Sequence, residues 1–95
     1  MSNIKIAIVE DDSDFAGLIK CYIKKYADEE KLSIDVALFQ DGLSFISEYR
    51  PIFDIVFMDI EMPHMNGMAV ARKLYEIDKN ICIIFISHVV RYALK

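Results

Sequence analysis

Three short apolar runs divide the chain, and each is almost free of polar interruptions. They cover Ile4–Val9, with Lys5 as the exception, then Ile55–Met58 and Ile81–Ile86. Continuous rather than alternating hydrophobicity is typical of strands that are buried on both faces, as in a parallel sheet. A fourth segment, residues 32–39 (LSIDVALF), alternates more between apolar and polar positions. Alternation predicts a strand with one covered face, so this segment is expected at an edge of the sheet.

Helical periodicity fills the intervals between these strands. Asp12 is expected to cap the first helix, whose single apolar stripe comprises Phe15, Leu18, Ile19, Tyr22, Ile23 and Tyr26. Asp41 is placed to cap a short helix that Pro51 ends, and Asn66 or Gly67 opens a third helix. The order β-α-β-α-β-α-β, followed by the start of a helix, predicts right-handed crossovers and a parallel sheet covered on both sides.

Composition and charge narrow the class of protein. Ninety-five residues, 55% hydrophobic and 27% charged, fit one small globular domain. The net charge of −4 gives no reason to expect a nucleic-acid surface. No apolar run is long enough for a membrane helix, and Glu10, Asp11 and Asp12 interrupt the N-terminal run that a signal peptide would need. A cytoplasmic domain without membrane contact is therefore expected, with Cys21 and Cys82 as buried small side chains.

Acidic or hydroxyl side chains follow three of the four predicted strands. Glu10 and Asp11 follow the first strand, Asp59 follows the third and Ser87 follows the fourth. Parallel sheets bind ligands beyond the carboxyl ends of their strands, so these side chains are expected to converge. Converging carboxylates repel one another, and Mg²⁺ removes that conflict because it takes oxygen ligands. With Mg²⁺ bound, a carboxylate can attack phosphorus and become an aspartyl phosphate, to which a hydroxyl such as Ser87 can donate a hydrogen bond.

The chain resembles the response-regulator receiver domains of two-component signalling. The resemblance is carried by the strand-end residues and by the segment Met62-Pro63-His64-Met65-Asn66-Gly67. The resemblance covers essentially the whole chain. It implies a flavodoxin-like α/β fold, a doubly wound parallel sheet with strand order 2-1-3-4. Pro63 and Gly67 are expected to set the geometry of the loop before the third helix.

The same resemblance implies a role for each residue at the strand ends. Asp59 would be the phosphoacceptor, and a sensor histidine kinase would be the phosphodonor. Asp11 would bind Mg²⁺ directly, Glu10 mainly through water, and Asp59 and the backbone carbonyl of Glu61 would complete the protein ligands. Ser87 would be the switch hydroxyl, which moves toward the phosphoryl group and repositions the loop and helix that follow.

The sequence also departs from the family pattern at its C-terminal end. In the family, the chain continues through a fifth strand and a fifth helix, and the fifth strand carries a lysine and an aromatic switch residue. Residues 1–95 are expected to form a receiver that ends within the fourth helix. Residues 86–95 (ISHVVRYALK) resemble, more loosely, receivers with LytTR-type DNA-binding output domains. Without a fifth strand, Ile81–Ile86 would be an uncharged apolar edge, so a homo-oligomer through the fourth strand is expected.

Three functions remain open on the sequence. The first is a phosphorylation-dependent signalling domain that regulates an output partner and is not an enzyme. The second is a receiver that only binds or dimerises and is not efficiently phosphorylated, which the unassigned lysine favours and the intact acidic set opposes. The third, a small Mg²⁺-dependent phosphohydrolase, needs a second acid close after Asp59, and only Glu61 is available.

Overall fold

A four-stranded parallel sheet with helices on both faces forms the body of the protein, which a computed structural model describes for residues 3–62 and 65–87. The strands of this sheet are β1 (Ile4–Val9), β2 (Ile34–Phe39), β3 (Ile55–Asp59) and β6 (Cys82–Ile86). The helices are α1 (Ser13–Glu30), α2 (Gly42–Ser47) and α3 (Gly67–Ile77). Two short strands, β4 (Glu61–Met62) and β5 (Met65–Asn66), pair antiparallel. The helix expected at the C-terminus lies outside the described residues.

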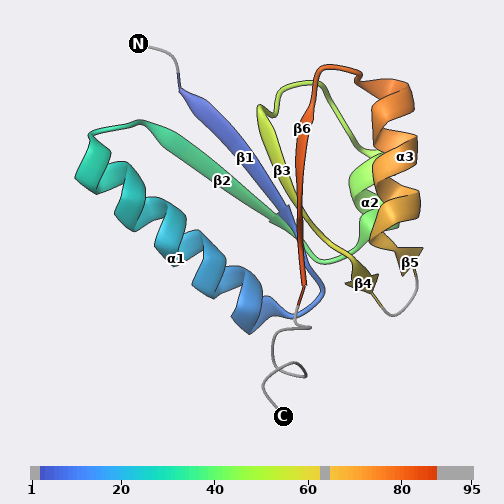
Figure 1. The fold of residues 1–95 in the computed structure, drawn as a ribbon, viewed down its shortest axis with the longest axis horizontal. Coiled ribbons are helices and arrows are strands. Elements are labelled where there is room, and N and C mark those ends of the chain that lie inside the picture. The colour runs from blue at the N-terminus through green and yellow to red at the C-terminus, as the bar shows by residue number, and fades with distance from the viewer. Residues whose placement is uncertain (1–2, 63–64, 88–95) are drawn as a thin grey trace.

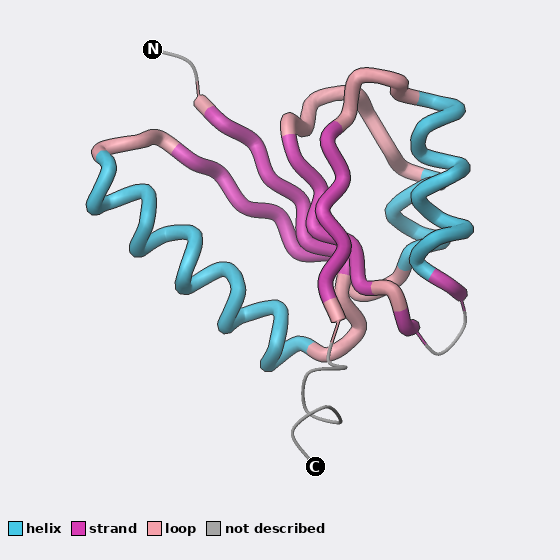
Figure 2. The backbone as a smooth tube through the Cα atoms, in the orientation of Figure 1, coloured by secondary structure: helices cyan, strands magenta, loops and turns pink. Residues whose placement is uncertain are grey.

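The order of the sheet is β2-β1-β3-β6, with every pair parallel. Because β6 is the fourth long strand along the chain, the predicted order 2-1-3-4 and the doubly wound α/β fold are confirmed. The alternating strand β2 lies at one edge, as predicted, and β6 lies at the other. Figures 1 and 2 show α1 on one side of the sheet and α2 with α3 on the other. Within the described part of the chain, no helix has the length and apolar character that spanning a membrane requires.

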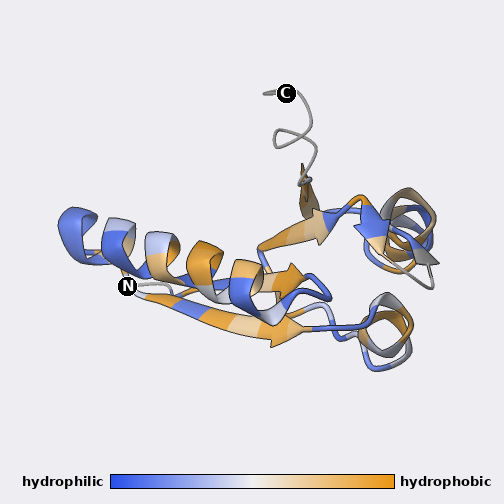
Figure 3. Cartoon of the chain, turned by 90° about the horizontal axis from the view of Figure 1, so that it is seen from below, coloured by the Kyte–Doolittle hydropathy of each residue, from blue (hydrophilic) through white to orange (hydrophobic). Residues whose placement is uncertain are grey.

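Alternate residues of the central strands pack into two separate apolar clusters. In β1, Ala7 and Val9 belong to the cluster with α2 and α3, whereas Ile6 and Ile8 belong to the cluster with α1. Ala7, Ile8 and Val9 are completely buried, at 0% exposure. Figure 3 shows that the strands are hydrophobic over most of their length and that α1 becomes hydrophilic toward its C-terminal end. Continuous apolar runs therefore arise because both sides of these strands are covered.

The three helices begin at the predicted caps. The Asp12 carboxylate accepts hydrogen bonds from the amides of Asp14 and Phe15, and the Asp41 carboxylate accepts one from Leu43. The Asn66 side chain caps α3 in the same way. Each cap satisfies an amide that the first turn leaves without a backbone partner.

The end of α2 differs from the prediction, because the helix stops at Ser47 and not at Pro51. Tyr49 therefore lies in the following loop and packs edge-on against Phe45, with 5.4 Å between ring centroids. Phe53 also packs against this pair. The loop turns early because its aromatic side chains join the core of this face.

The predicted burial of the two cysteines is wrong. Cys21 and Cys82 are exposed, since Cys21 lies on the outer side of α1 and Cys82 begins the edge strand β6. The apolar stripe of α1 is only half covered: Leu18 is 48%, Tyr22 65% and Tyr26 56% exposed. Among the described elements, α1 is the one helix on this face (Figure 1), and a groove of about 530 Å³ with an apolar lining lies between α1 and strands β1, β2 and β3.

A hydrogen bond from Tyr49 links the loop after α2 to the C-terminal end of α3. The Tyr49 hydroxyl donates to Asp78 Oδ2 over 2.6 Å, and Asp78 is the C-cap residue of α3. Burial raises the pKa of Tyr49 above its ordinary value, and the hydrogen bond and negative charge of Asp78 raise it further. Because the folded-state pKa is raised, the resulting stabilisation is fully present below the ordinary phenol value of 10.0 and is lost as pH rises through the folded-state pKa.

We expect Tyr49→Phe to lower the free energy of unfolding by about 1 kcal/mol at neutral pH, because it removes one hydrogen bond and little packing. Urea unfolding measures the difference, and it should shrink in strongly alkaline solution. Tyr22→Phe is the control, since Tyr22 is 65% exposed. Equal stability of the two variants would show that the Tyr49 bond contributes nothing.

Candidate functional site

Three predicted acidic residues meet at the carboxyl ends of β1 and β3. One carboxylate oxygen from each of Glu10, Asp11 and Asp59 lies within 4.8 Å of the other two. Glu10 and Asp59 are each only 1% exposed, whereas Asp11 is exposed to solvent. The structure thus brings together the acids that the strand-end argument selected, with one side of the cluster open to solvent.

The position of Glu10 follows from the pairing of β1 with β2. Its amide donates to the carbonyl of Phe39 over 2.9 Å, which continues the β1–β2 ladder by one residue. Its Oε2 accepts the amide of Asp12 over 3.1 Å. Asp12 in turn caps α1, so Asp11 is held between a strand end and a helix start. Backbone contacts on both sides therefore fix this acidic pair.

Asp59 is the last residue of β3 and is paired in register with Ile86 of β6. Its Oδ1 accepts the amide of Glu61 over 3.2 Å, which turns the chain after the strand. The amide of Ile60 donates to the carbonyl of Ile86 over 3.0 Å. Because Ser87 follows Ile86 directly, this bond holds the half-buried Ser87 at the same edge of the sheet as Asp59.

The loop after Asp59 is closed by the short β4–β5 pairing. Glu61 pairs with Asn66, and the side chain of Glu61 is exposed. Its backbone lies close to the acidic cluster, because its amide bonds to Asp59. Pro63 lies outside the described residues, so its role in loop geometry stays a prediction.

Gly67 approaches Asp59 so closely that no side chain fits. A Cβ built on Gly67 would lie 1.9 Å from the carbonyl oxygen of Asp59, far inside any allowed contact. The Gly67 amide donates to the carbonyl of Ile60 over 2.8 Å, so the start of α3 is fastened to the loop after β3. The predicted importance of Gly67 for this loop thus has a steric basis. Sequence reasoning gave Ile60 no role, because a contact made by backbone atoms leaves no side-chain signal.

The oxygen donors of this cluster fit a hard divalent cation. Two of the three carboxylates are buried, and burying like charges side by side is costly unless a cation compensates them. Mg²⁺ takes one or two carboxylates and keeps several waters, which suits a cluster open to solvent at Asp11. The arrangement can therefore hold a cation beside the Asp59 carboxylate.

We expect Gly67→Ala to lower the free energy of unfolding by about 2 kcal/mol or more, because the methyl group would collide with the Asp59 backbone. Gly17→Ala in α1 is the matched control, since a Cβ there meets nothing within 4 Å. That change should raise stability by roughly 0.5–1 kcal/mol through helix propensity. Urea unfolding of both variants measures the contrast, and a harmless Gly67→Ala would refute the steric argument.

Comparison with known proteins gives a consistent result. The chain matches the family described as Response regulator receiver domain over residues 6–94. It is 32% identical over 97 residues to an uncharacterized response regulatory protein of Vibrio cholerae serotype O1, covering 98% of this chain and 35% of that protein. The chain thus spans about a third of the length of this relative.

Solved structures share the fold. The receiver domain of the Francisella response regulator 1452 superposes with a TM-score of 0.69 at 25% identity, covering 90% of this chain and 66% of that one. A sensor protein from Polaromonas sp. JS666 superposes with a TM-score of 0.75 at 20% identity, covering 99% of this chain and 74% of that one. With a family match over residues 6–94 and the acidic cluster at the expected strand ends, the chain belongs to the response regulator receiver domain family.

Proposed function

We propose that this receiver domain accepts a phosphoryl group on Asp59 with the help of Mg²⁺ and regulates an output partner through the resulting change. The observation that supports this most directly is the convergence of Glu10, Asp11 and Asp59 within 4.8 Å at the strand ends. Receiver domains are signalling domains that take phosphoryl groups from histidine kinases, so a sensor histidine kinase is the proposed donor.

The proposed ligands of the cation are the side chains of Asp59, Asp11 and Glu10 and the backbone carbonyl of Glu61. Bound Mg²⁺ would neutralise negative charge that builds up on the phosphoryl oxygens during transfer. The amide of Glu61 orients the Asp59 carboxylate by donating to Oδ1. A carboxylate oxygen of Asp59 then attacks phosphorus, and the bond between phosphorus and the imidazole nitrogen of the donor histidine breaks as the acyl phosphate forms.

Ser87 is the proposed switch hydroxyl, which donates a hydrogen bond to the new phosphoryl group. Because the carbonyl of Ile86 accepts the amide of Ile60, a shift of Ser87 would act on both the end of β6 and the loop after Asp59. The segment beyond Ser87 would carry this change to the output partner. The loose resemblance of residues 86–95 to LytTR-type regulators supports a role in transcription regulation for the wider protein.

Incubation with Mg²⁺ and acetyl phosphate should produce one phosphoryl adduct, measured by intact mass. Asp59→Ala should abolish the adduct because it removes the nucleophile, and chelation of Mg²⁺ by EDTA should strongly reduce it. Asp14→Ala is the control, since Asp14 is an exposed acid in the first turn of α1. A folded chain that stays unmodified would contradict the proposal and favour a receiver that only binds its partners.

Self-association through β6 is the second part of the proposal. In the described sheet, β6 pairs only with β3, so its outer edge carries backbone groups that no described strand satisfies. None of its five residues is charged, and Ile84 and Phe85 are 41% and 38% exposed. Ile84 is in register with Phe57, which lines the open groove beside α1, so the apolar edge continues into that groove. An uncharged edge of this kind favours pairing with another chain.

At tens of micromolar, roughly where exposed apolar edges associate, sedimentation velocity should show a dimer or larger species. Ile84→Lys should shift the population toward monomer, because a lysine on an edge strand opposes pairing. Leu38→Lys on the opposite edge strand β2 is the matched control, as Leu38 is 43% exposed against 41% for Ile84. A monomeric parent, or equal disruption by both lysines, would rule out association through β6.

A further inference from the structure

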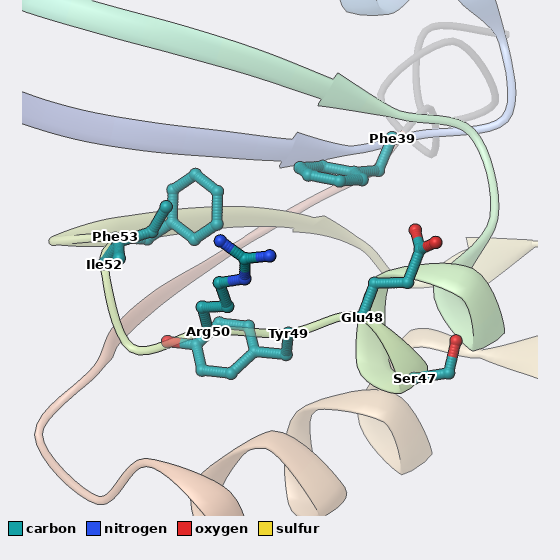
Figure 4. A pocket seen from close by; sticks show the side chains of 7 residues that line it. All are labelled: Phe39, Ser47, Glu48, Tyr49, Arg50, Ile52 and Phe53. Carbon is teal, nitrogen blue, oxygen red and sulfur yellow. The ribbon is translucent and has the colours of Figure 1, made fainter.

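A second hollow lies between the end of β2 and the loop that follows α2. It has a volume of about 630 Å³, within the range of small-molecule sites. None of the three acids of the phosphoacceptor site is among the described residues that line it. Its walls combine aromatic rings with the side chains of Glu48 and Arg50 (Figure 4). A ligand of this hollow would therefore be recognised by chemistry that is separate from phosphoryl transfer.

The aromatic part of the hollow is held in place by packing beneath it. Phe39 and Phe53, both half-buried, stand nearly perpendicular, with 6.0 Å between ring centroids. Both rings contact Phe45, which is only 1% exposed, at 4.8 and 6.1 Å. Tyr49 completes the cluster, and its hydroxyl is engaged with Asp78. A fixed set of ring faces and edges suits a flat apolar group that packs against it.

The charged part of the hollow carries one positive and one negative side chain. In the view of Figure 4 the Arg50 guanidinium lies on the side of Phe53, while the Glu48 carboxylate lies on the other side and points toward Phe39. Both residues are exposed, and within the described part of the chain neither forms an ion pair. Opposite charges thus flank one aromatic surface.

We propose that this hollow binds a free α-amino acid with an aromatic side chain. The guanidinium of Arg50 would take the carboxylate of the ligand, because its planar donors match a carboxylate pairwise. The carboxylate of Glu48 would take the ligand ammonium group, and the ligand ring would pack on Phe39 and Phe53. An aromatic acid without an amine would place its carboxylate near the like charge of Glu48. An aromatic amine without an acid would place its ammonium group near the like charge of Arg50. The zwitterion satisfies both.

Titration of the full chain, labelled with ¹⁵N, with L-phenylalanine tests this assignment. Saturable amide shifts are expected around residue 39 and residues 47–53. Three analogues each lack one recognised group: L-phenylalaninamide lacks the carboxylate, N-acetyl-L-phenylalanine lacks the ammonium charge and glycine lacks the ring. Each should bind at least about tenfold more weakly than L-phenylalanine. Equal binding of any analogue, or shifts that do not saturate, would overturn the proposal.

Two variants and two matched controls locate the binding charges. Arg50→Gln and Glu48→Gln should each weaken L-phenylalanine binding by about tenfold or more, because each removes a charge-assisted hydrogen bond. Arg72→Gln and Glu76→Gln change exposed residues of the same types on α3, outside the hollow, and should leave the affinity unchanged. An unchanged affinity in either hollow variant would refute the assignment. Phosphorylation of Asp59 by acetyl phosphate is scored separately, so failure of one proposal does not affect the other.

Discussion

The burial of two carboxylates on neighbouring strands is the constraint on which the rest of this domain depends. Val9 of β1 is in register with Met58 of β3, so Glu10 and Asp59 are the next residues along two paired strands. Both side chains are 1% exposed, and like charges this close oppose folding. The apolar residues behind them, which include Val9 and Met58 at 0% exposure, supply the compensating burial. The sheet thus holds the acids together at the edge where a cation can reach them.

The two faces of the sheet are covered unequally, and this asymmetry separates the surfaces of the domain. Helices α2 and α3, with the aromatic cluster around Phe45, pack on one face, and a hollow lies at the margin of that face. On the other face, α1 is the one helix in the described part of the chain, and an apolar groove lies between it and the strands. One side therefore carries a hollow with two opposite charges, and the other carries an apolar groove beside α1.

The features that depended on local pattern could be predicted from the sequence. Continuous apolar runs identified three strands, of which β1 and β3 are buried; the expectation that such a run is buried on both faces is wrong for β6, which lies at the sheet edge. Asp12, Asp41 and Asn66 marked helix starts because capping involves only near neighbours. The acidic cluster followed from strand ends meeting at one edge. Burial that depends on which helix covers which face could not be predicted. Cys21 has apolar neighbours in the sequence yet lies on the outer side of α1.

Contacts made by backbone atoms were also out of reach of sequence reasoning. Nothing in the residue type of Ile60 indicates that its amide bonds to the end of β6. The steric requirement for glycine at position 67 is visible only once the backbone of Asp59 is placed beside it. The early end of α2 belongs to the same class, since Tyr49 leaves the helix to pack on Phe45. Such features arise from three-dimensional proximity between segments that are separate in the sequence.

The hydrogen bond between the Ile60 amide and the Ile86 carbonyl gives the domain an internal spectroscopic reporter. A backbone amide that is fixed by such a bond exchanges its hydrogen slowly with solvent, and its resonance frequency depends on the length of the bond. A backbone shift at Ser87 that moves the Ile86 carbonyl would change the length of this bond, because Ser87 is the next residue after Ile86. A single amide resonance thus follows the position of the end of β6 without any label that perturbs the site.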